Sequence, residues 1–225
     1  MNMLDILFNK GIMENLKLGL TLFHCLSEQF NDQERNAVCT LLMSLVNTAF
    51  KGVDITETRS VVFGKSHNIQ KTVYFIVKDG RDIIGFCSCR DCLACGQRVL
   101  YRSGTIISPE FQGLGLYKLL IGKALRSYHQ FIALETQNPR VMASVINSRL
   151  FINVWPNKDL IIPPHIQAMV YELKKNENID GMIERNSAKE PMFSELPLSK
   201  EEWVNNFFKK NIGHCDKVFI IAKVL

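Results

Sequence analysis

The chain has 225 residues, of which 47% are apolar and 22% are charged, and its net charge is +5. It contains no run of about 18 apolar residues, so we expect no membrane-spanning helix and no membrane partner. Basic residues are spread along the chain without a basic run, which argues against a nucleic-acid partner. The N-terminal residues lack the basic-then-apolar order of a secretory signal, so we expect a cytoplasmic protein with reduced thiols.

The first fifty residues predict mainly helix. Residues 1–30 contain apolar positions without a clean period, and we expect a helical extension there. Residues 31–52 predict an amphipathic helix, because Asn31 and Glu34 form a capping-box pattern and Gly52 stands where the C-terminus of the helix is expected. The positions at helical spacing are Val38, Leu41, Leu42, Leu45, Val46 and Ala49.

The hydrophobic period then changes from helical to extended. Residues 59–64 (RSVVFG) and 71–89 predict strands. Asp79-Gly80 lies between two apolar runs and therefore marks a β-hairpin within the second of these segments. Residues 98–108 (RVLYRSGTIIS) predict the next strand, which a proline terminates.

A helix, a strand and a second helix are expected next. Apolar residues at helical spacing predict a helix from Leu116 to about Tyr128, and residues 131–135 (FIALE) predict a short buried strand. Asn138 followed by Pro139 is the pattern of a helix cap and a first helical residue, so another helix should begin there.

The last third of the sequence is less regular. We expect residues 151–213 to be a helical and loop excursion that opens with a loop-like segment. Within it, Pro163-Pro164 is expected to open a helix, and Ser199 with Glu202 repeats the capping pattern before another. The near-continuous apolar run at 216–225 predicts a final strand that is buried on both faces.

This order of elements predicts one α/β (α+β) domain over residues 1–225. Its centre would be a single mixed, largely antiparallel sheet flanked by helices. Helical additions are expected at the N-terminus and before the last strand.

Two glycines stand between the strand at 98–108 and the helix that follows. A helix start leaves about four N–H groups without partners and carries partial positive charge, so it favours an anion such as phosphate. Gly113 and Gly115 would let phosphate oxygens approach the backbone. Alternatively, the glycines only make a tight turn, and the residues alone leave both interpretations open. The P-loop and dinucleotide patterns are absent, since Lys118 occupies the third glycine position of the latter.

Residues 106–120 (IISPEFQGLGLYKLL) resemble the acetyl-CoA-binding motif of the GNAT N-acetyltransferase superfamily. Gln112 and Gly115 match that motif, whereas Tyr117 stands where the final Gly or Ala is usual. The preceding segment DIIGFCS and the later segment LETQNPRVMASVIN resemble the flanking parts of the family. The likeness covers roughly residues 33–150.

The resemblance implies a GNAT-like fold and acetyl-CoA as the acyl donor. The backbone amides from Gln112 through Tyr117 would hold the pyrophosphate, the preceding strand would offer hydrogen bonds to the pantetheine arm, and Asn138 would reach the cofactor from the opposite side. The implied cofactor-binding residues are Ile106, Ile107, Ser108, Gln112, Gly113, Leu114, Gly115, Leu116, Tyr117 and Asn138.

The catalytic groups are less evident than the cofactor site. Many members of the family use a tyrosine in the later helix as an acid, but Val145 and Ile146 stand at the comparable place. Glu135 is the candidate base, and Tyr117 is the candidate acid, with Tyr171 as an alternative acid. Each has a plainer interpretation, Glu135 as a strand-end carboxylate at the surface and Tyr117 as amphipathic packing.

Four of the seven cysteines fall within nine residues. Cys87, Cys89, Cys92 and Cys95 could bring four thiolates to one metal, but zinc sites usually use two separated ligand pairs. Small buried positions in a strand and turn would explain the same cysteines, and no metal is expected. We expect Cys87 and Cys89 to share one face of a strand, with the backbone leaving the strand by Cys92.

The expected function is transfer of an acetyl group from acetyl-CoA to a primary amine by direct attack in a ternary complex. The acceptor is left open as a small-molecule or protein amine, and so is a homodimer. Two alternatives stand beside it: a catalytically silent acetyl-CoA sensor or adaptor, and a metal-binding regulator built on the cysteine cluster.

Overall fold

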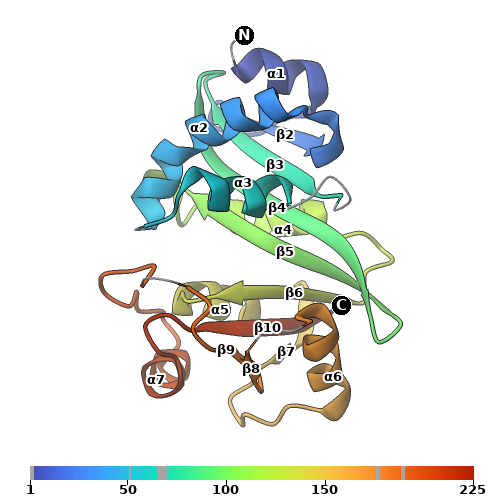
Figure 1. The fold of residues 1–225 in the computed structure, drawn as a ribbon, viewed down its shortest axis with the longest axis vertical. Coiled ribbons are helices and arrows are strands. Elements are labelled where there is room, and N and C mark those ends of the chain that lie inside the picture. The colour runs from blue at the N-terminus through green and yellow to red at the C-terminus, as the bar shows by residue number, and fades with distance from the viewer. Residues whose placement is uncertain (1–2, 51, 65–69, 176–177, 189–190) are drawn as a thin grey trace. The chain divides into compact units, whose positions relative to one another are not determined.

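The computed structural model describes residues 3–50, 52–64, 70–175, 178–188 and 191–225, and the chain divides into two compact units (Figure 1). The first comprises Met1–Asp91 and Arg102–Leu125, and the second comprises Cys92–Tyr101 and Arg126–Leu225. Two long strands, β4 and β5, contribute residues to both units.

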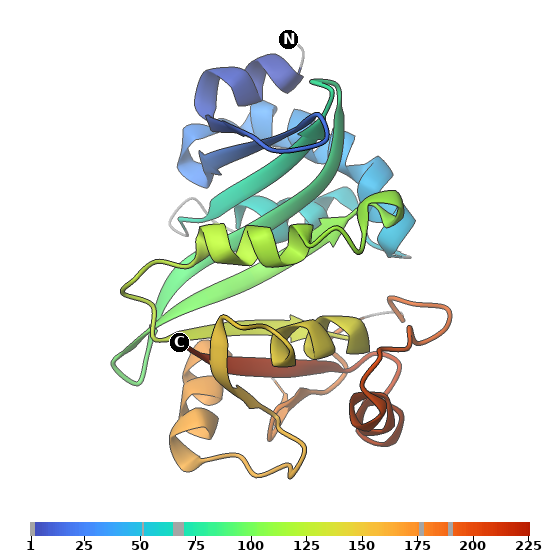
Figure 2. The ribbon, with the colours of Figure 1, turned by 180° about the vertical axis from the view of Figure 1, so that it is seen from behind.

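The first unit is a sheet with helices on both faces. Its strands follow the order β1-β2-β3-β4-β5, and the pairs β1/β2, β2/β3 and β3/β4 are antiparallel. Helices α2 and α3 cover one face, and α4 covers the other (Figures 1 and 2). The elements that contribute to this unit are α1 (Met3–Lys10), β1 (Ile12–Asn15), β2 (Leu20–Leu26), α2 (Asp32–Ala49), α3 (Ile55–Phe63), β3 (Thr72–Lys78), β4 (Asp82–Ala94), β5 (Gln97–Ile107) and α4 (Leu116–Ala124), with 3-10 turns at Ser27–Gln29 and Pro109–Phe111.

The core of the first unit lies between the sheet and helices α2 and α3. Burying aromatic and branched side chains from both layers is the main stabilising contribution, at about 1.5–3 kcal/mol for each large side chain. A hydrogen bond from the hydroxyl of Ser88 to the carbonyl of Val62, 2.8 Å long, ties β4 to α3. Fully buried members of this core include Phe23, Val38, Leu42, Phe63 and Phe75.

The second unit is built around the C-terminal strand. β10 pairs antiparallel with β6, β7 and β9, and its residues Val218–Ala222 are all buried. Helix α6 packs its buried residues Ile166, Met169 and Val170 into the core that this strand shares. The remaining elements are β6 (Phe131–Thr136), α5 (Pro139–Ile146), β7 (Phe151–Trp155), α6 (Pro164–Leu173), β8 (Ile179–Asp180), β9 (Ile183–Glu184), α7 (Glu202–Asn211) and β10 (Lys217–Val224).

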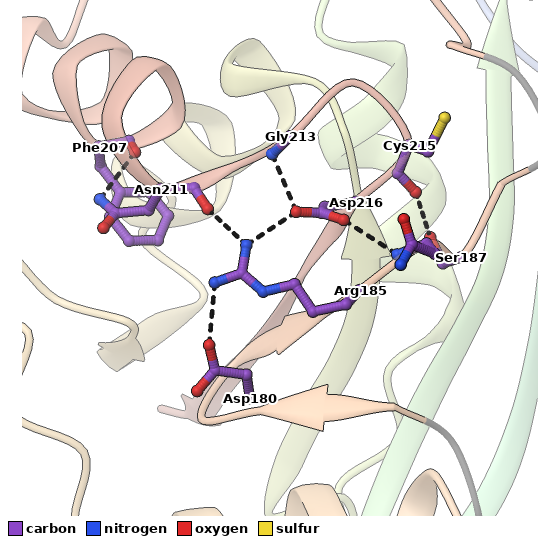
Figure 3. A network of polar contacts seen from close by, with 9 residues as sticks. Asp180, Arg185, Ser187, Phe207, Asn211, Gly213, Cys215 and Asp216 are labelled. Carbon is purple, nitrogen blue, oxygen red and sulfur yellow. Dashed lines mark hydrogen bonds and ion pairs between the residues drawn. The ribbon is translucent and has the colours of Figure 1, made fainter.

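A polar network fastens the β8–β9 hairpin to the start of β10 within the second unit (Figure 3). The guanidinium of Arg185 donates to Asp216 at 2.8 Å and to Asp180 at 2.9 Å. The carboxylate of Asp216 also accepts from the backbone N–H groups of Asn186 and Gly213, both at 2.9 Å. Burial alone would raise the pKa of Asp216, but these hydrogen bonds and the Arg185 charge hold it below its ordinary value.

The predicted fold class is confirmed as a mixed α/β fold with a largely antiparallel sheet and flanking helices. The capping box of Asn31 and Glu34 opens α2, and the Asp79-Gly80 turn joins β3 to β4. Asn138 caps α5, and the final strand is buried on both faces. Among the described residues, no helix is long and apolar enough to cross a membrane.

Two predictions for the N-terminal half are wrong. Residues 1–30 are not all helical, because after α1 the chain forms β1 and β2, which pair around a turn at Leu18 and Gly19. The segment at 59–64 belongs to helix α3 and not to a strand. Its valines favour a strand, but Asp54 caps the helix by accepting from the N–H of Glu57, and the apolar residues of the helix pack into the core that it shares with α2 and the sheet.

Three predictions for later segments also need correction. The helix expected to reach Tyr128 ends at Ala124. Residues 151–155 are strand β7 and not a loop, because they pair with β10, and the excursion at 151–213 also contains β8 and β9. The cap of α7 is Glu201, whereas the Ser199 hydroxyl bonds the Asn205 side chain at 2.9 Å.

Candidate functional site

The candidate site is the elbow between β5 and α4 in the first unit, residues 106–117. The elbow turns through a 3-10 segment, in which the N–H of Phe111 donates to the carbonyl of Ser108 at 2.9 Å. The side-chain amide of Gln112 donates to the carbonyl of Ile107 at 3.0 Å and braces the turn from inside. The matched glutamine of the motif therefore has a local structural role.

Both glycines of the elbow adopt backbone conformations that favour glycine. Gly113 has a φ of 83° and Gly115 a φ of 76°, in the left-handed region. A Cβ added to either residue would meet no described atom within 4 Å apart from those of its chain neighbours. The glycines therefore make the turn and also leave open space beside the backbone.

The start of α4 has the electrostatics of an anion site. Gly115 is its N-cap and offers no side chain to the first N–H groups, and the first turn contains no acidic residue. The first N–H groups of a helix lack intrahelical partners and carry partial positive charge. The N–H of Gln112 donates to the carbonyl of Pro109 at 3.2 Å, so this amide is engaged within the turn.

The first three residues of the elbow, 106–108, differ in whether their main-chain groups face β4 or point away from it. The N–H of Ser108 donates to the carbonyl of Ile84 in β4 at 2.8 Å. Because main-chain groups of alternate residues point to the same side of a strand, Ile106 also faces β4, and only Ile107 faces away. Gly85 permits the close approach of the two strands, since a Cβ there would lie 3.1 Å from the carbonyl oxygen of Ile106.

Tyr117 turns its hydroxyl into the first unit. The hydroxyl is buried and has no hydrogen-bond partner among the described residues, while the residue as a whole is half-buried. The guanidinium carbon of Arg102 lies 5.8 Å from the centre of the tyrosine ring, which is a cation–π distance. Burial raises the pKa of Tyr117, which the nearby Arg102 charge only partly opposes.

Glu135 and Asn138 belong to the second unit. The Glu135 carboxylate lies 2.7 Å from the ammonium of Lys174 and accepts a hydrogen bond from the hydroxyl of Tyr101. Burial would raise the pKa of Glu135, but the Lys174 charge and the hydrogen bonds outweigh it and hold the pKa below its ordinary value. The side-chain oxygen of Asn138 caps α5 by accepting from the N–H of Arg140 at 2.9 Å.

The four clustered cysteines separate between the two units. Cys87 and Cys89 are buried in the first, whereas Cys92 is half-buried and Cys95 exposed in the second. Strand β4 continues through Ala94, so the prediction that the backbone leaves the strand by Cys92 is wrong. Within the described ranges, no group of three or more His, Cys, Asp and Glu side chains is arranged to hold a metal ion.

Sequence reasoning did not single out Arg102 and Lys174, which contact the candidate residues Tyr117 and Glu135. A signal for Arg102 was present, because an arginine interrupts the apolar run of the strand at 98–108. Lys174 follows directly after α6 and gave no such signal, since a lysine at a helix end is usually exposed.

Comparison with known proteins identifies the family of the central region. Residues 40–145 match the model of the Acetyltransferase (GNAT) family. The chain carries a GNAT acetyltransferase domain. The match includes the elbow and confirms the resemblance found in residues 106–120. No curated protein matches the sequence of this chain significantly.

Solved structures similar to this GNAT chain share little sequence with it. Arabidopsis thaliana NAA60, in complex with acetyl-CoA, is 10% identical, with 90% of this chain and 98% of that chain covered and a TM-score of 0.45. The IAA acetyltransferase of Bacillus cereus is 10% identical, with 91% and 99% covered and a TM-score of 0.42.

A third similar structure is the glucosamine N-acetyltransferase region of a fungal multi-domain β-N-acetylglucosaminidase. It is 14% identical, with a TM-score of 0.40, and the match covers 76% of this chain but only 18% of the fungal one. With TM-scores below 0.5, these similarities assign neither substrate nor activity to the GNAT chain.

Proposed function

We propose that this GNAT chain is an acyl-CoA-dependent N-acyltransferase that transfers acetyl from acetyl-CoA to a primary amine in a ternary complex. The observation that carries the proposal is the open elbow at the start of α4. Two glycines with positive φ leave space beside the backbone N–H groups, and the first helical turn holds no acid. The partial positive charge of these N–H groups would attract a pyrophosphate, and the space beside them would accommodate it.

The residues present fit acetyl-CoA in three respects. The amides from Gly113 to Tyr117 would hold the pyrophosphate, and the N–H of Ile107, whose carbonyl already accepts from Gln112, would bond the pantetheine arm. Leu114 is half exposed beside these amides and would cover the ligand. Acetyl-CoA supplies an activated thioester, and the protein holds it in register with the amine, which can provide a large part of the rate enhancement.

The proposed base is Glu135 and the proposed acid is Tyr117, and the structure sets a condition on each. Glu135 can take a proton from the amine only if its ion pair with Lys174 loosens, because its pKa is lowered. Tyr117 retains its proton at neutral pH, but its hydroxyl is buried. If the amine enters the site in its neutral form, the reaction depends less on proton transfer by Glu135 and Tyr117.

A second candidate function is an acetyl-CoA sensor without turnover. Both candidate catalytic side chains are engaged or buried inside their units, which favours this alternative. The two functions make the same prediction for binding and opposite predictions for chemistry, so a single protein preparation can separate them.

The test combines a thermal-shift titration with a thiol-release assay. Acetyl-CoA and CoA at about 100 times their Kd should stabilise the protein by about 2.7 kcal/mol, whereas ATP should not. Release of CoA thiol with a member of a panel of polyamines, amino acids, aminoglycosides and peptides establishes the transferase. Binding without release by any amine supports the sensor, and no stabilisation by acetyl-CoA or CoA refutes the elbow as a CoA site.

A further inference from the structure

Two thiols face each other on one strand of the first unit, and neither has a role in the proposed transfer reaction. Cys87 and Cys89 lie two residues apart on β4, so their side chains point to the same face. Neither side chain is exposed, and their sulfur atoms are 3.6 Å apart. This distance is a contact between reduced thiols, and a bond between them requires only a local movement.

The surroundings of the two thiols are unequal. The hydroxyl of Thr105 donates to the sulfur of Cys87 at 3.1 Å. The hydrogen bond with Cys89 lowers the pKa of Cys87 against the effect of burial. The hydrogen bond from Thr105 and the positive charge of Arg102 act in the same direction. The hydrogen bond with Cys87 and burial raise the pKa of Cys89 well above its ordinary value. The Cys87 thiol therefore loses its proton more readily than the Cys89 thiol does.

The strand geometry makes a bond between these sulfurs strained and therefore reversible. Residues two apart on an extended strand have Cα atoms about 6.6 Å apart. Disulfides span Cα distances up to about 6.8 Å, and most are shorter. Strained disulfides are more easily reduced, which is typical of labile and regulatory ones.

The thiol pair lies on the face of the sheet that α4 covers. Cys87 is paired in register with Tyr74 of β3, so the two side chains share a face. The hydroxyl of Tyr74 donates to the carbonyl of Lys123 in α4 at 3.1 Å. Burial is the larger cause of the raised pKa of Tyr117, in the first turn of α4, and negative charge on these sulfurs also raises it. The thiol pair is therefore linked by these interactions to the helix that begins at the elbow.

We propose that Cys87 and Cys89 are an oxidative modification site, at which a hydroperoxide drives formation of an intramolecular disulfide that weakens acyl-CoA binding at the elbow. The sulfur of Cys87 attacks the peroxide, forming an S–O bond as the O–O bond breaks and an alcohol or water leaves. The Cys89 thiol then attacks this sulfenic acid, and water leaves as the S–S bond forms. A dithiol reductant reverses the change. The effect on acyl-CoA rests on the proposed function, whereas formation of the disulfide does not.

The sequence allows the disulfide to be located by mass. Trypsin cleaves after Arg81 and Arg90, so the peptide at 82–90 contains Cys87 and Cys89 and no other cysteine. Cys92 and Cys95 fall in the next peptide, at 91–98. After treatment with hydrogen peroxide and alkylation, we expect peptide 82–90 to lose two hydrogens, to take no alkyl group and to recover both thiols with dithiothreitol.

The functional effect is measured by calorimetric titration of the full chain with acetyl-CoA before and after peroxide. Oxidation should weaken binding about tenfold, within the usual range of coupling between two sites, and dithiothreitol should restore it. Cys89→Ala, or Cys89→Ser as a second variant should the first fold poorly, should bind like the reduced parent and lose the response. A Cys95→Ser control, which removes the exposed thiol, should keep the response.

The outcomes separate the two proposals. Alkylation of Cys87 and Cys89 without loss of two hydrogens, or a disulfide to another peptide, overturns the modification site. An intramolecular disulfide with unchanged acetyl-CoA affinity overturns the coupling. A disulfide in a chain that binds no acetyl-CoA in either state refutes the proposed function and leaves the modification site standing.

Discussion

Replacing Gly115 by alanine separates the backbone role of this residue from its role at the proposed phosphate site. The residue has a φ of 76°, and an added Cβ would meet open space. Alanine in the left-handed region costs roughly 1–2 kcal/mol, and a less flexible unfolded chain offsets roughly 0.4–1 kcal/mol of it. We therefore expect a net loss of about 1 kcal/mol, which lowers the melting temperature by about 2–4 °C for a chain of this size.

The effect of the same substitution on acetyl-CoA should be larger. The added methyl group would occupy the space from which phosphate oxygens approach the N–H groups of the elbow. Hydrogen bonds to a charged group contribute about 1.5–3 kcal/mol, so the Kd for acetyl-CoA should rise by roughly 10- to 150-fold. Calorimetric titration measures this change directly, and differential scanning calorimetry measures the loss of stability.

Gly80→Ala is the matched control. Gly80 lies in the β3–β4 turn of the same unit, has a φ of 65° and likewise has no described atom within 4 Å of an added Cβ. This variant should lose similar stability and keep its affinity for acetyl-CoA. Should Gly115→Ala bind acetyl-CoA as tightly as Gly80→Ala does, the pyrophosphate does not lie at this elbow.

Three further substitutions test the interior of the two units. Lys174→Met removes the cation between two partly buried carboxylates, so the free energy of unfolding measured by urea titration should fall by about 3 kcal/mol. Lys175 is exposed, so the control variant Lys175→Met should change this free energy little. Tyr117→Phe removes a buried hydroxyl without a described partner, so scanning calorimetry should show about 1 kcal/mol of added stability; a fall in turnover instead would support Tyr117 as the acid. Burial lowers the pKa of Lys71 from 10.5 to about 8, so between these pH values the unfolded chain binds more protons at this residue and the contribution of Lys71 to stability rises with pH; in urea titrations the stability of the parent relative to Lys71→Met should therefore increase across this range.

The elements that the sequence predicted correctly are those in which local chemistry and tertiary packing agree. The α2 helix has both a capping box and an apolar stripe, and the β3–β4 hairpin has its Asp-Gly turn between two apolar runs. The failures occur where the two disagree. Val61 and Val62 favour a strand, but Asp54 opens a helix that packs them into the core between the helices and the sheet. Strand β7 depends on pairing with β10, which lies about seventy residues away in the chain and gives no local signal.

The same distinction applies to the candidate site. The elbow could be predicted because its function depends on consecutive backbone groups, which a short motif specifies. The partners of Glu135 could not, because Lys174 reaches it from an element far along the chain. The sequence indicated a carboxylate at a strand end and gave no information on its counter-ion, and the counter-ion decides how strongly the carboxylate attracts a proton.

Tyr117 is the one departure from the family motif within the elbow, and its orientation explains how the elbow accommodates it. A bulky residue at this position could block the approach of a ligand or line its site. The hydroxyl is instead buried in the first unit, with the ring near Arg102. The open space beside Gly113 and Gly115 is unaffected, since an added Cβ at either would still meet no described atom within 4 Å. The departure therefore changes what lies beneath the helix and leaves the backbone donors at its start in place, which is why binding and catalysis can respond differently to Tyr117→Phe.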